Sequence, residues 1–357
     1  MNAVRDAPFI PIRPQTNSIR HMHSHPAILR SSRPANRPRF ISKVFGLSAG
    51  LLGSLSTVQA ALIQQTAYNP STSTWNVAAV WGNNAVTAEN EYQTVAGNAS
   101  DIGTSFTVNG YAWNYRGQVR DYPSANNTQS NSPFAGGSLI LSGDTRLLMK
   151  GRAGYTSAAN IVMRDDSHII LAPDSNGGNP ASATLAGTIA VDDGATTAIG
   201  LLSNTGSLTF NISSTISGGS GSTLQLALMG NNVNRIFVSG DYSGFTGTFY
   251  LGISSTGSTA GLGSTFSFAS GSALLATLQL IPHANIGFDL DGDVTFGSVV
   301  VGEDTLEAGT YDYAALSALG FGSSFVDNGG SLTVIPEPSS VTLAFLASMA
   351  FLRRRRK

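Results

Sequence analysis

The chain contains no cysteine and has few charged or aromatic residues. Of its 357 residues, 11% are charged and 8% are aromatic. Without cysteine, no disulfide can form, and no thiolate can act as a nucleophile or bind a metal. The sequence also lacks a Gly-x-Ser-x-Gly element, a phosphate-binding loop, a dinucleotide fingerprint and a metalloprotease helix motif. These absences exclude thiol chemistry and leave no familiar catalytic motif.

Positive charge is nearly missing from the middle of the chain. The net charge is −1, but eight Lys and Arg residues precede Ala61 and five follow Ile335, with one acidic residue at each end. The segment between them holds seven basic and nineteen acidic residues, which gives a net charge of −12. Nucleic-acid binding is therefore disfavoured. An acidic segment rich in Thr, Ser, Asn and Gly and free of cysteine is typical of an extracellular bacterial protein.

The start of the chain, up to Ala60, has the pattern of an extended signal peptide. Residues 1–38 are basic and rich in proline, and two further cations precede the apolar run Val44–Leu55. Small residues then lead to Ala60, which predicts a signal helix, export by the Sec machinery, and cleavage between Ala60 and Ala61. Residues 1–38 either form a long basic region of this signal or indicate that translation starts later, for example at Met22.

The main segment has the two-residue period of β-strands, and helices are almost absent from its pattern. Apolar runs recur at a regular distance: 22 residues separate Leu139 from Ile161, 28 separate Ile161 from Ile189, and 28 separate Leu208 from Ile236. Such spacing is typical of stacked coils. We therefore predict an all-β, right-handed parallel β-helix. A β-sandwich is the alternative, because short strands and turn residues also fit that fold.

Residues 61–133 differ from the rest because they hold all three tryptophans. Trp75, Trp81 and Trp113 lie here, and Trp113 and Tyr115 alternate along one predicted strand. One interpretation is a cap that seals the open end of the solenoid. The other is a glycan-binding platform in which Trp113 and Tyr115 stack on sugar rings.

Three acidic residues alternate around a turn glycine. Asp289, Asp291 and Asp293 have the oxygen density that calcium prefers, but the later acidic ligand of a calcium loop is replaced by Val300. A polar turn between strands is the alternative. We therefore expect no metal and no cofactor, with calcium at these three residues as the alternative.

A second acidic group provides the alternative of a polysaccharide lyase or glycoside hydrolase. Asp165 and Asp166 lie beside Arg164 and His168, and Asp192 follows after about the length of one predicted coil. Stacked coils would bring these carboxylates together, and paired carboxylates cleave glycosidic bonds. The other interpretation is a solvated corner, because such pairs are common in turns. We expect that the protein is not an enzyme.

The end of the chain, from Ile335 to Lys357, combines three elements in order. Pro336, Glu337, Pro338 and Ser339 form an extended strip, since proline opposes helix. The apolar run Val341–Leu352 predicts a transmembrane helix, although its 12 residues fall short of the roughly 20 that span a bilayer. Four arginines and a lysine end the chain and would stay on the cytoplasmic side. The four arginines are Arg353, Arg354, Arg355 and Arg356.

This order of elements resembles the PEP-CTERM sorting signal of Gram-negative bacteria, which a membrane transpeptidase-like enzyme, exosortase, recognises. The resemblance implies passage through the inner membrane, cleavage of the tail, and release to the cell surface or extracellular matrix. It also implies a link to exopolysaccharide and biofilm formation.

Three further segments, Thr184–Ile189, Ile216–Gly221 and Val238–Thr248, resemble autotransporter-associated β-strand repeats. That resemblance implies a β-helical, mainly structural passenger. We therefore predict four parts: residues 1–60 as signal peptide, 61–133 as aromatic-rich cap, 134–334 as β-helix body and 335–357 as sorting signal. The expected role is a structural or adhesion protein of the cell surface.

Overall fold

The computed structural model describes residues 60–66, 74–97, 103–108, 111–121, 131–150, 154–172, 182–203, 206–253 and 261–335. The chain divides into two compact units, Met1–Thr57 and Val58–Lys357, and every described residue belongs to the second. The predicted signal helix and the C-terminal apolar helix lie outside the described residues.

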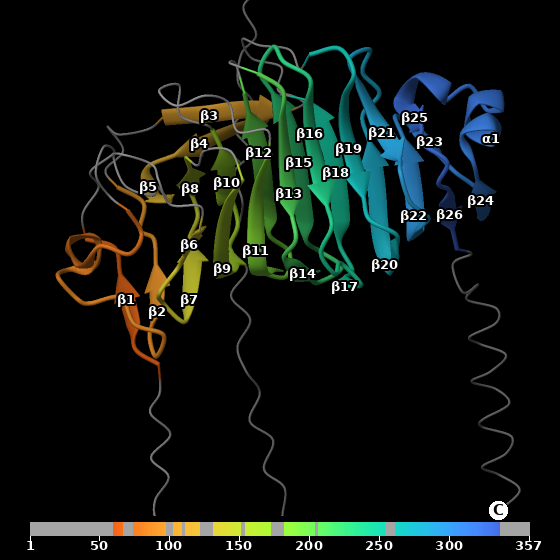
Figure 1. The fold of residues 1–357 in the computed structure, drawn as a ribbon. Coiled ribbons are helices and arrows are strands. Elements are labelled where there is room, and N and C mark those ends of the chain that lie inside the picture. The colour runs from red at the N-terminus through yellow and green to blue at the C-terminus, as the bar shows by residue number, and fades with distance from the viewer. Residues whose placement is uncertain are drawn as a thin grey trace, which may run out of the picture. The chain divides into compact units, whose positions relative to one another are not determined.

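The second unit is a parallel β-solenoid of about 7 turns (Figure 1). Each turn contributes strands to two sheets, which we call sheet A and sheet B, and nearly all neighbouring strands are parallel. The prediction of an all-β parallel solenoid is confirmed. The β-sandwich alternative is wrong, because its sheets would be antiparallel.

Sheet A has 13 strands among the described residues. Along its main path these are β1 (Leu62–Gln64), β2 (Glu91–Gln93), β7 (Ser138–Leu141), β9 (Tyr155–Met163), β11 (Ser182–Val191), β13 (Leu208–Ile212), β16 (Asn234–Val238), β19 (Ser264–Phe268), β21 (Ile286–Leu290) and β25 (Phe325–Asp327). Beside this path lie β6 (Asn131–Pro133), β14 (Thr215–Gly218) and β17 (Gly244–Phe245).

Sheet B has 11 strands among the described residues. They are β5 (Gly117–Asp121), β8 (Thr145–Met149), β10 (His168–Leu171), β12 (Thr196–Leu202), β15 (Thr223–Met229), β18 (Thr248–Ile253), β20 (Gly271–Leu280), β22 (Val294–Val301), β26 (Leu332–Val334), β24 (Gly309–Tyr311) and β23 (Asp304–Thr305). A separate hairpin, β3 (Gly103–Val108) and β4 (Tyr111–Tyr115), is antiparallel.

Two of the three sequence spacings correspond to strand registers. Leu139 pairs with Ile161, and Ile161 pairs with Ile189, so these residues form one inward row. The third spacing is two residues too long, because Ile236 pairs with Phe210 rather than with Leu208. The error leaves the facing unchanged, since side chains two residues apart point to the same side of a strand.

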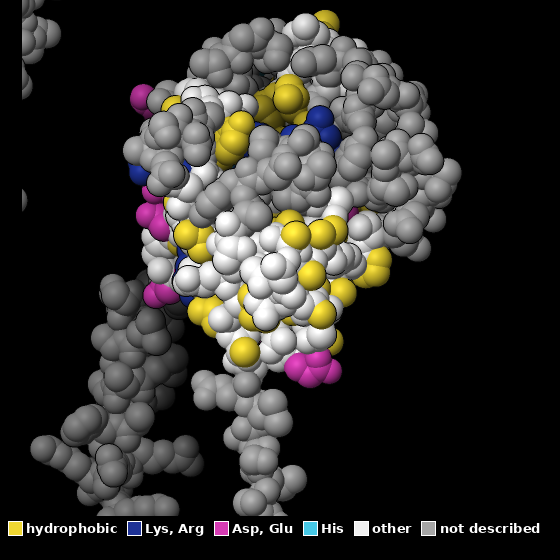
Figure 2. Space-filling model, turned by 90° about the vertical axis from the view of Figure 1, so that its left-hand side faces the viewer, with side chains coloured by type: hydrophobic (Ala, Val, Ile, Leu, Met, Phe, Trp, Pro, Cys, Tyr) yellow, Lys and Arg dark blue, Asp and Glu magenta, His cyan; other side chains and the backbone are white. Residues whose placement is uncertain are grey.

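Aromatic side chains fill the N-terminal end of the core. Near the N-terminal end, Trp75, Trp81, Tyr92 and Phe134 are buried in one cluster, with the rings of Trp75 and Phe134 5.2 Å apart. The 3-10 helix η1 (Ala78–Trp81) supplies Trp81. Figure 2 looks onto this end, where hydrophobic side chains are scattered among uncharged ones.

The other end is closed by short helices. Helix α1 (Tyr313–Ala318) is capped at its N-terminus by Asp312, whose carboxylate accepts a hydrogen bond from the Ala315 amide 2.7 Å away. The 3-10 helix η3 (Gly322–Ser324) then leads into β25. Leu316 of α1 is fully buried against the core.

The solenoid reaches further toward the N-terminus than residue 134. Strands β1, β2 and β6 belong to sheet A and β5 belongs to sheet B, although all four lie in residues 61–133. The region that the sequence assigns to a cap therefore also supplies strands of the solenoid. Two of the tryptophans that distinguish this region in the sequence, Trp75 and Trp81, are buried in the core.

Candidate functional site

The β3–β4 hairpin lies across the outer face of sheet B (Figure 1). Phe106, Val108 and Trp113 of the hairpin pack on side chains from several successive coils. The sheet residues are small where the hairpin approaches: a Cβ atom on Gly252 would stand 2.8 Å from Val108. Gly200 is similarly close to Phe106, at 3.1 Å. The hairpin therefore covers this face rather than leaving it open to a ligand.

A row of polar side chains on sheet B holds the hairpin. Arg146 and His168 are register partners and both reach Ser105: Nη1 of Arg146 donates to Ser105 Oγ at 2.8 Å, and Nε2 of His168 lies 2.7 Å from the same oxygen. Arg146 also donates to Gln118, and its guanidinium lies 3.4 Å from the centroid of the Tyr115 ring. Burial, and secondarily the charge of Arg146, lowers the pKa of His168 to about 3. The imidazole is therefore neutral.

These contacts argue against the predicted sugar platform of Trp113 and Tyr115. Trp113 is only 1% exposed, and its Nε1 donates to Oε1 of Gln225 at 3.0 Å. Tyr115 is half-buried beneath Arg146. An indole enclosed between a hairpin and a sheet cannot stack on a sugar ring. Alternation of aromatics along β4 could not show this, because it does not tell which face is covered.

The predicted acidic group at residues 164–166 is a corner between sheets. Met163 pairs with Val191, so Asp192 lies beside Arg164 rather than beside Asp165, at 3.5 Å between Arg164 Nε and Asp192 Oδ2. Asp165 accepts a hydrogen bond from the Thr196 amide at 2.8 Å. Each of these carboxylates therefore has a partner within the protein.

The remaining members of that predicted group, Asp166 and His168, form hydrogen bonds with residues of the hairpin. Tyr111 donates a hydrogen bond to Asp166, and burial, with this bond, raises the pKa of Tyr111. Asp166 has a positive φ of 62°, which lets the chain turn sharply between sheets. His168 faces Ser105 rather than the carboxylates. The geometry therefore assigns these residues to the corner and to the hairpin contact.

Two of the three predicted calcium ligands, Asp289 and Asp291, pair with an arginine instead. Nη2 of Arg235 lies 3.4 Å from Asp289 Oδ2 and also donates to Asp291. Asp293 accepts from Ser331 Oγ at 2.8 Å and so points elsewhere. Within the part of the chain that the structure describes, no three metal-ligating side chains come together to hold an ion. The sequence missed Arg235 because it lies on β16, two strands away from β21 in sheet A and far from these acids along the chain.

An open groove of about 350 Å³ lies beside this arginine on the outer face of sheet A. Thr209, Arg235 and Thr265 are register partners on β13, β16 and β19, so they form a row across three coils. The complete lining is Ser207, Leu208, Thr209, Val233, Asn234, Arg235, Thr265 and Asp289. We call these residues the Arg235 groove, and it is the candidate functional site.

The guanidinium in this groove is held by several contacts within the protein. Its Nε donates to Ser267 Oγ at 2.9 Å, and its Cζ lies 4.8 Å from the centroid of the Phe237 ring. Asp289 is 6% exposed and also accepts a hydrogen bond from Asn328 Nδ2. Part of the guanidinium therefore contacts other residues of the protein, while 32% of the Arg235 side chain remains exposed.

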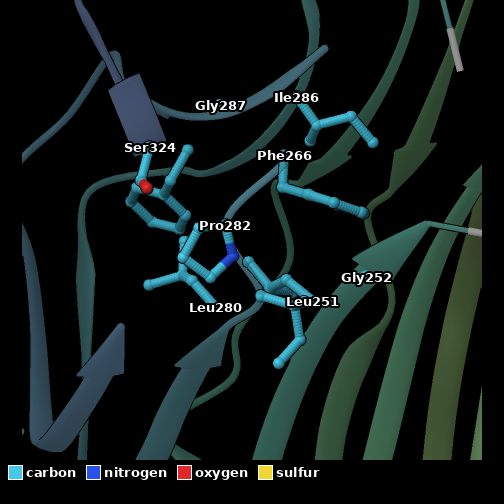
Figure 3. Close-up of a pocket in the computed structure, with 10 residues that line it drawn as sticks. Leu251, Gly252, Phe266, Leu280, Pro282, Ile286, Gly287 and Ser324 are labelled. Carbon is cyan, nitrogen blue, oxygen red and sulfur yellow. The ribbon is translucent and has the colours of Figure 1, made fainter. Parts of the chain in front are cut away.

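A second pocket lies in the apolar core between β18 and β21 (Figure 3). Leu251, Phe266, Leu280 and Phe288 line it, with a volume of about 10 Å³. That volume is close to what one water molecule needs. The pocket is too small for an organic ligand.

The residues predicted for processing lie at or beyond the ends of the solenoid. Ala60 and Ala61 are exposed, and β1 begins at Leu62. Residues 336–357, with Pro336, Glu337, Pro338, Ser339 and the terminal arginines, lie outside the described residues. Among the residues with a described structure, no helix has the length and hydrophobicity to cross a bilayer.

Comparisons with protein-family models, with curated proteins and with solved structures found no significant match to this chain.

Proposed function

We propose that this protein is a non-enzymatic structural or adhesion protein of the bacterial cell surface or extracellular matrix. It is exported through a signal peptide spanning residues 1–60, passes the inner membrane, and is sorted by exosortase at the tail of residues 335–357. Its solenoid is right-handed, in keeping with the strong preference for right-handed crossovers between parallel strands. It acts in association with exopolysaccharide, in a biofilm or similar matrix.

One observation carries this proposal: both processing sites flank the solenoid without cutting a strand. Cleavage between Ala60 and Ala61 leaves β1 intact, since that strand begins at Leu62. At the other end β26 finishes at Val334, two residues before Pro336. Removal of both ends would leave the described solenoid complete.

The polar contacts support a structural role over a catalytic one. Asp192 is paired with Arg164, Asp165 accepts from a backbone amide, and Asp166 accepts from Tyr111. A glycoside hydrolase needs two carboxyl groups free to face one glycosidic bond. Carboxylates that hold corners and a hairpin are not arranged for that reaction.

The sorting step is tested by replacing Pro336, Glu337 and Pro338 with alanine in the full chain, expressed in a host that has an exosortase. The variant should accumulate in the inner-membrane fraction as a chain that retains its tail, while the parent chain is released. Thr342→Ala, which leaves the strip intact and the following run apolar, is the matched control. Equal release of the triple variant and the parent would overturn the proposal.

A further inference from the structure

We propose that the Arg235 groove binds a neutral polysaccharide chain lying across successive coils of sheet A. The inference rests on the proposed function in one respect only: the exopolysaccharide around the cell is taken as the source of this ligand. The ligand class follows from the hydroxyl groups, the charge and the backbone pairing of the groove.

The groove presents hydroxyl groups with unused hydrogen-bonding capacity. Within the described residues, no hydrogen bond engages the side chains of Ser207, Thr209 or Thr265. Nη1 of Arg235 likewise has no partner there, although Nε and Nη2 do. Neighbouring strands are about 4.8 Å apart, so the row repeats hydrogen-bonding groups at a regular interval across the sheet. Such a row suits a polymer that carries hydroxyl groups on every unit.

The charge of the groove favours a neutral ligand. Arg235 is the only Lys or Arg residue between Arg164 and Arg353 in the sequence. Its charge is more than balanced by Asp289 and Asp291, both of which pair with it. The remaining charge is negative, so a uronic-acid polymer or another polyanion would be repelled. A sugar without charge can accept from Nη1 and exchange hydrogen bonds with the threonines.

The backbone of the groove argues against a peptide. Strands β13, β16, β19 and β21 each have a strand on both sides in sheet A, so their backbone groups are already paired. An extended peptide usually binds by adding a strand to a free edge. Val233, which is 48% exposed at the groove, instead offers an apolar contact to the carbon face of a sugar ring.

The test compares the full chain with the double variant Thr209→Val/Thr265→Val. Valine keeps the shape of threonine but removes the hydroxyl, and neither hydroxyl makes a hydrogen bond within the described part of the chain, so the fold should persist. The matched control is Thr184→Val, which removes a half-buried hydroxyl from the same sheet without touching the groove. Binding is measured on an array of neutral and uronic-acid oligosaccharides, and then by calorimetry with the best neutral oligosaccharide.

The parent and Thr184→Val should bind neutral oligosaccharides equally, and the double variant should bind roughly tenfold more weakly, as expected for two lost hydrogen bonds. Three results would overturn the inference: equal binding by the double variant, preference for uronic-acid oligosaccharides, or no binding to any glycan. Release of the chain from cells is scored separately. A parent chain that is released normally but binds no glycan counts against the groove alone, and a parent chain that is not released counts against the proposed sorting.

Discussion

Trp113 Nε1 donates a hydrogen bond to Gln225 Oε1 over 3.0 Å, joining residues that are 112 positions apart in the sequence. This bond ties the β3–β4 hairpin to β15 and explains why an aromatic residue that looks suited to a glycan is buried. Through this bond and the burial of Trp113, the hairpin should contribute to the stability of the solenoid.

Replacement of Trp113 with alanine should therefore destabilise the protein. Loss of a buried tryptophan side chain typically lowers the free energy of unfolding by about 3–5 kcal/mol. The measurement is urea unfolding of the full chain, with Val77→Ala, at an exposed position, as the control. If Trp113→Ala unfolds at the parent's urea concentration while glycan binding is lost, the indole is a sugar platform after all.

A buried carboxyl group on β5 should make stability depend on pH. Asp121 is fully buried and, among the described residues, neither of its carboxyl oxygens has a well-formed hydrogen bond. Burial raises its pKa from 3.8 to about 7, and nearby hydroxyls of Ser132 and Ser157 offset this only in part. The folded state therefore holds a proton that the unfolded state releases between pH 3.8 and 7. This group destabilises the fold progressively as the pH rises through that window.

Asp121→Asn removes this penalty. At pH 8 the variant should be more stable than the parent by up to about 4 kcal/mol, and the advantage should shrink toward pH 4. Urea unfolding at pH 4, 6 and 8 gives the comparison. An advantage that is constant across these three pH values would show that Asp121 does not titrate in this window.

His168 should have the opposite effect. Its pKa is about 3 in the folded protein, against an ordinary value of 6.5, because burial disfavours the charged imidazole. The unfolded state therefore binds the extra proton, and the contribution of His168 to stability is lost as the pH falls from 6.5 toward 3. As the pH falls from 6.5 to 4, the penalty from Asp121 decreases while the stabilisation from His168 is lost. These two changes offset each other, so the free energy of unfolding of the parent should change little over this range.

His168→Gln breaks this balance. The variant should become more stable relative to its own value at pH 7 as the pH falls to 4, because the opposing contribution of His168 is removed and that of Asp121 remains. Unfolding curves at these two pH values test this prediction. A decline in stability on acidification, as large as that expected of His168 alone, would mean that another group controls the response.

Close stacking of coils at Gly240 should tolerate no side chain. A Cβ atom there would lie 2.0 Å from the carbonyl oxygen of Ser214 on the neighbouring coil, and backbone cannot move aside easily. Gly240→Ala should lower the free energy of unfolding by about 1–3 kcal/mol. Gly244→Ala is the control, since its nearest neighbour would be 3.7 Å away. Equal unfolding midpoints for the two variants would contradict the coil stacking seen here.

The stacking of the coils could be predicted from the sequence because the inner rows are strict. Leu139, Ile161 and Ile189 must all face the core, so their spacing is the length of a coil. The hairpin could not be predicted in this way. Its neighbours on sheet B, such as Ala198 and Gly200, are merely small, and small residues do not reveal that a second layer covers them.

The candidate site was only partly visible in the sequence. The sequence marks Asp289 and Asp291 as part of one acidic group that is either a polar turn or a calcium site, but it does not show that Arg235 is their partner. The threonines of the groove gave no signal, since Thr209 and Thr265 resemble many others on outer strand faces. Only the register of the coils brings them into one row.

The most direct test of the proposed function is the mass and terminal sequence of the protein released to the surface of cells that carry an exosortase. The account predicts a chain that begins at Ala61 and ends within the strip around Pro336–Ser339, without the terminal arginines. A surface protein that starts upstream of Ala61 and still carries Arg353–Lys357 would contradict it.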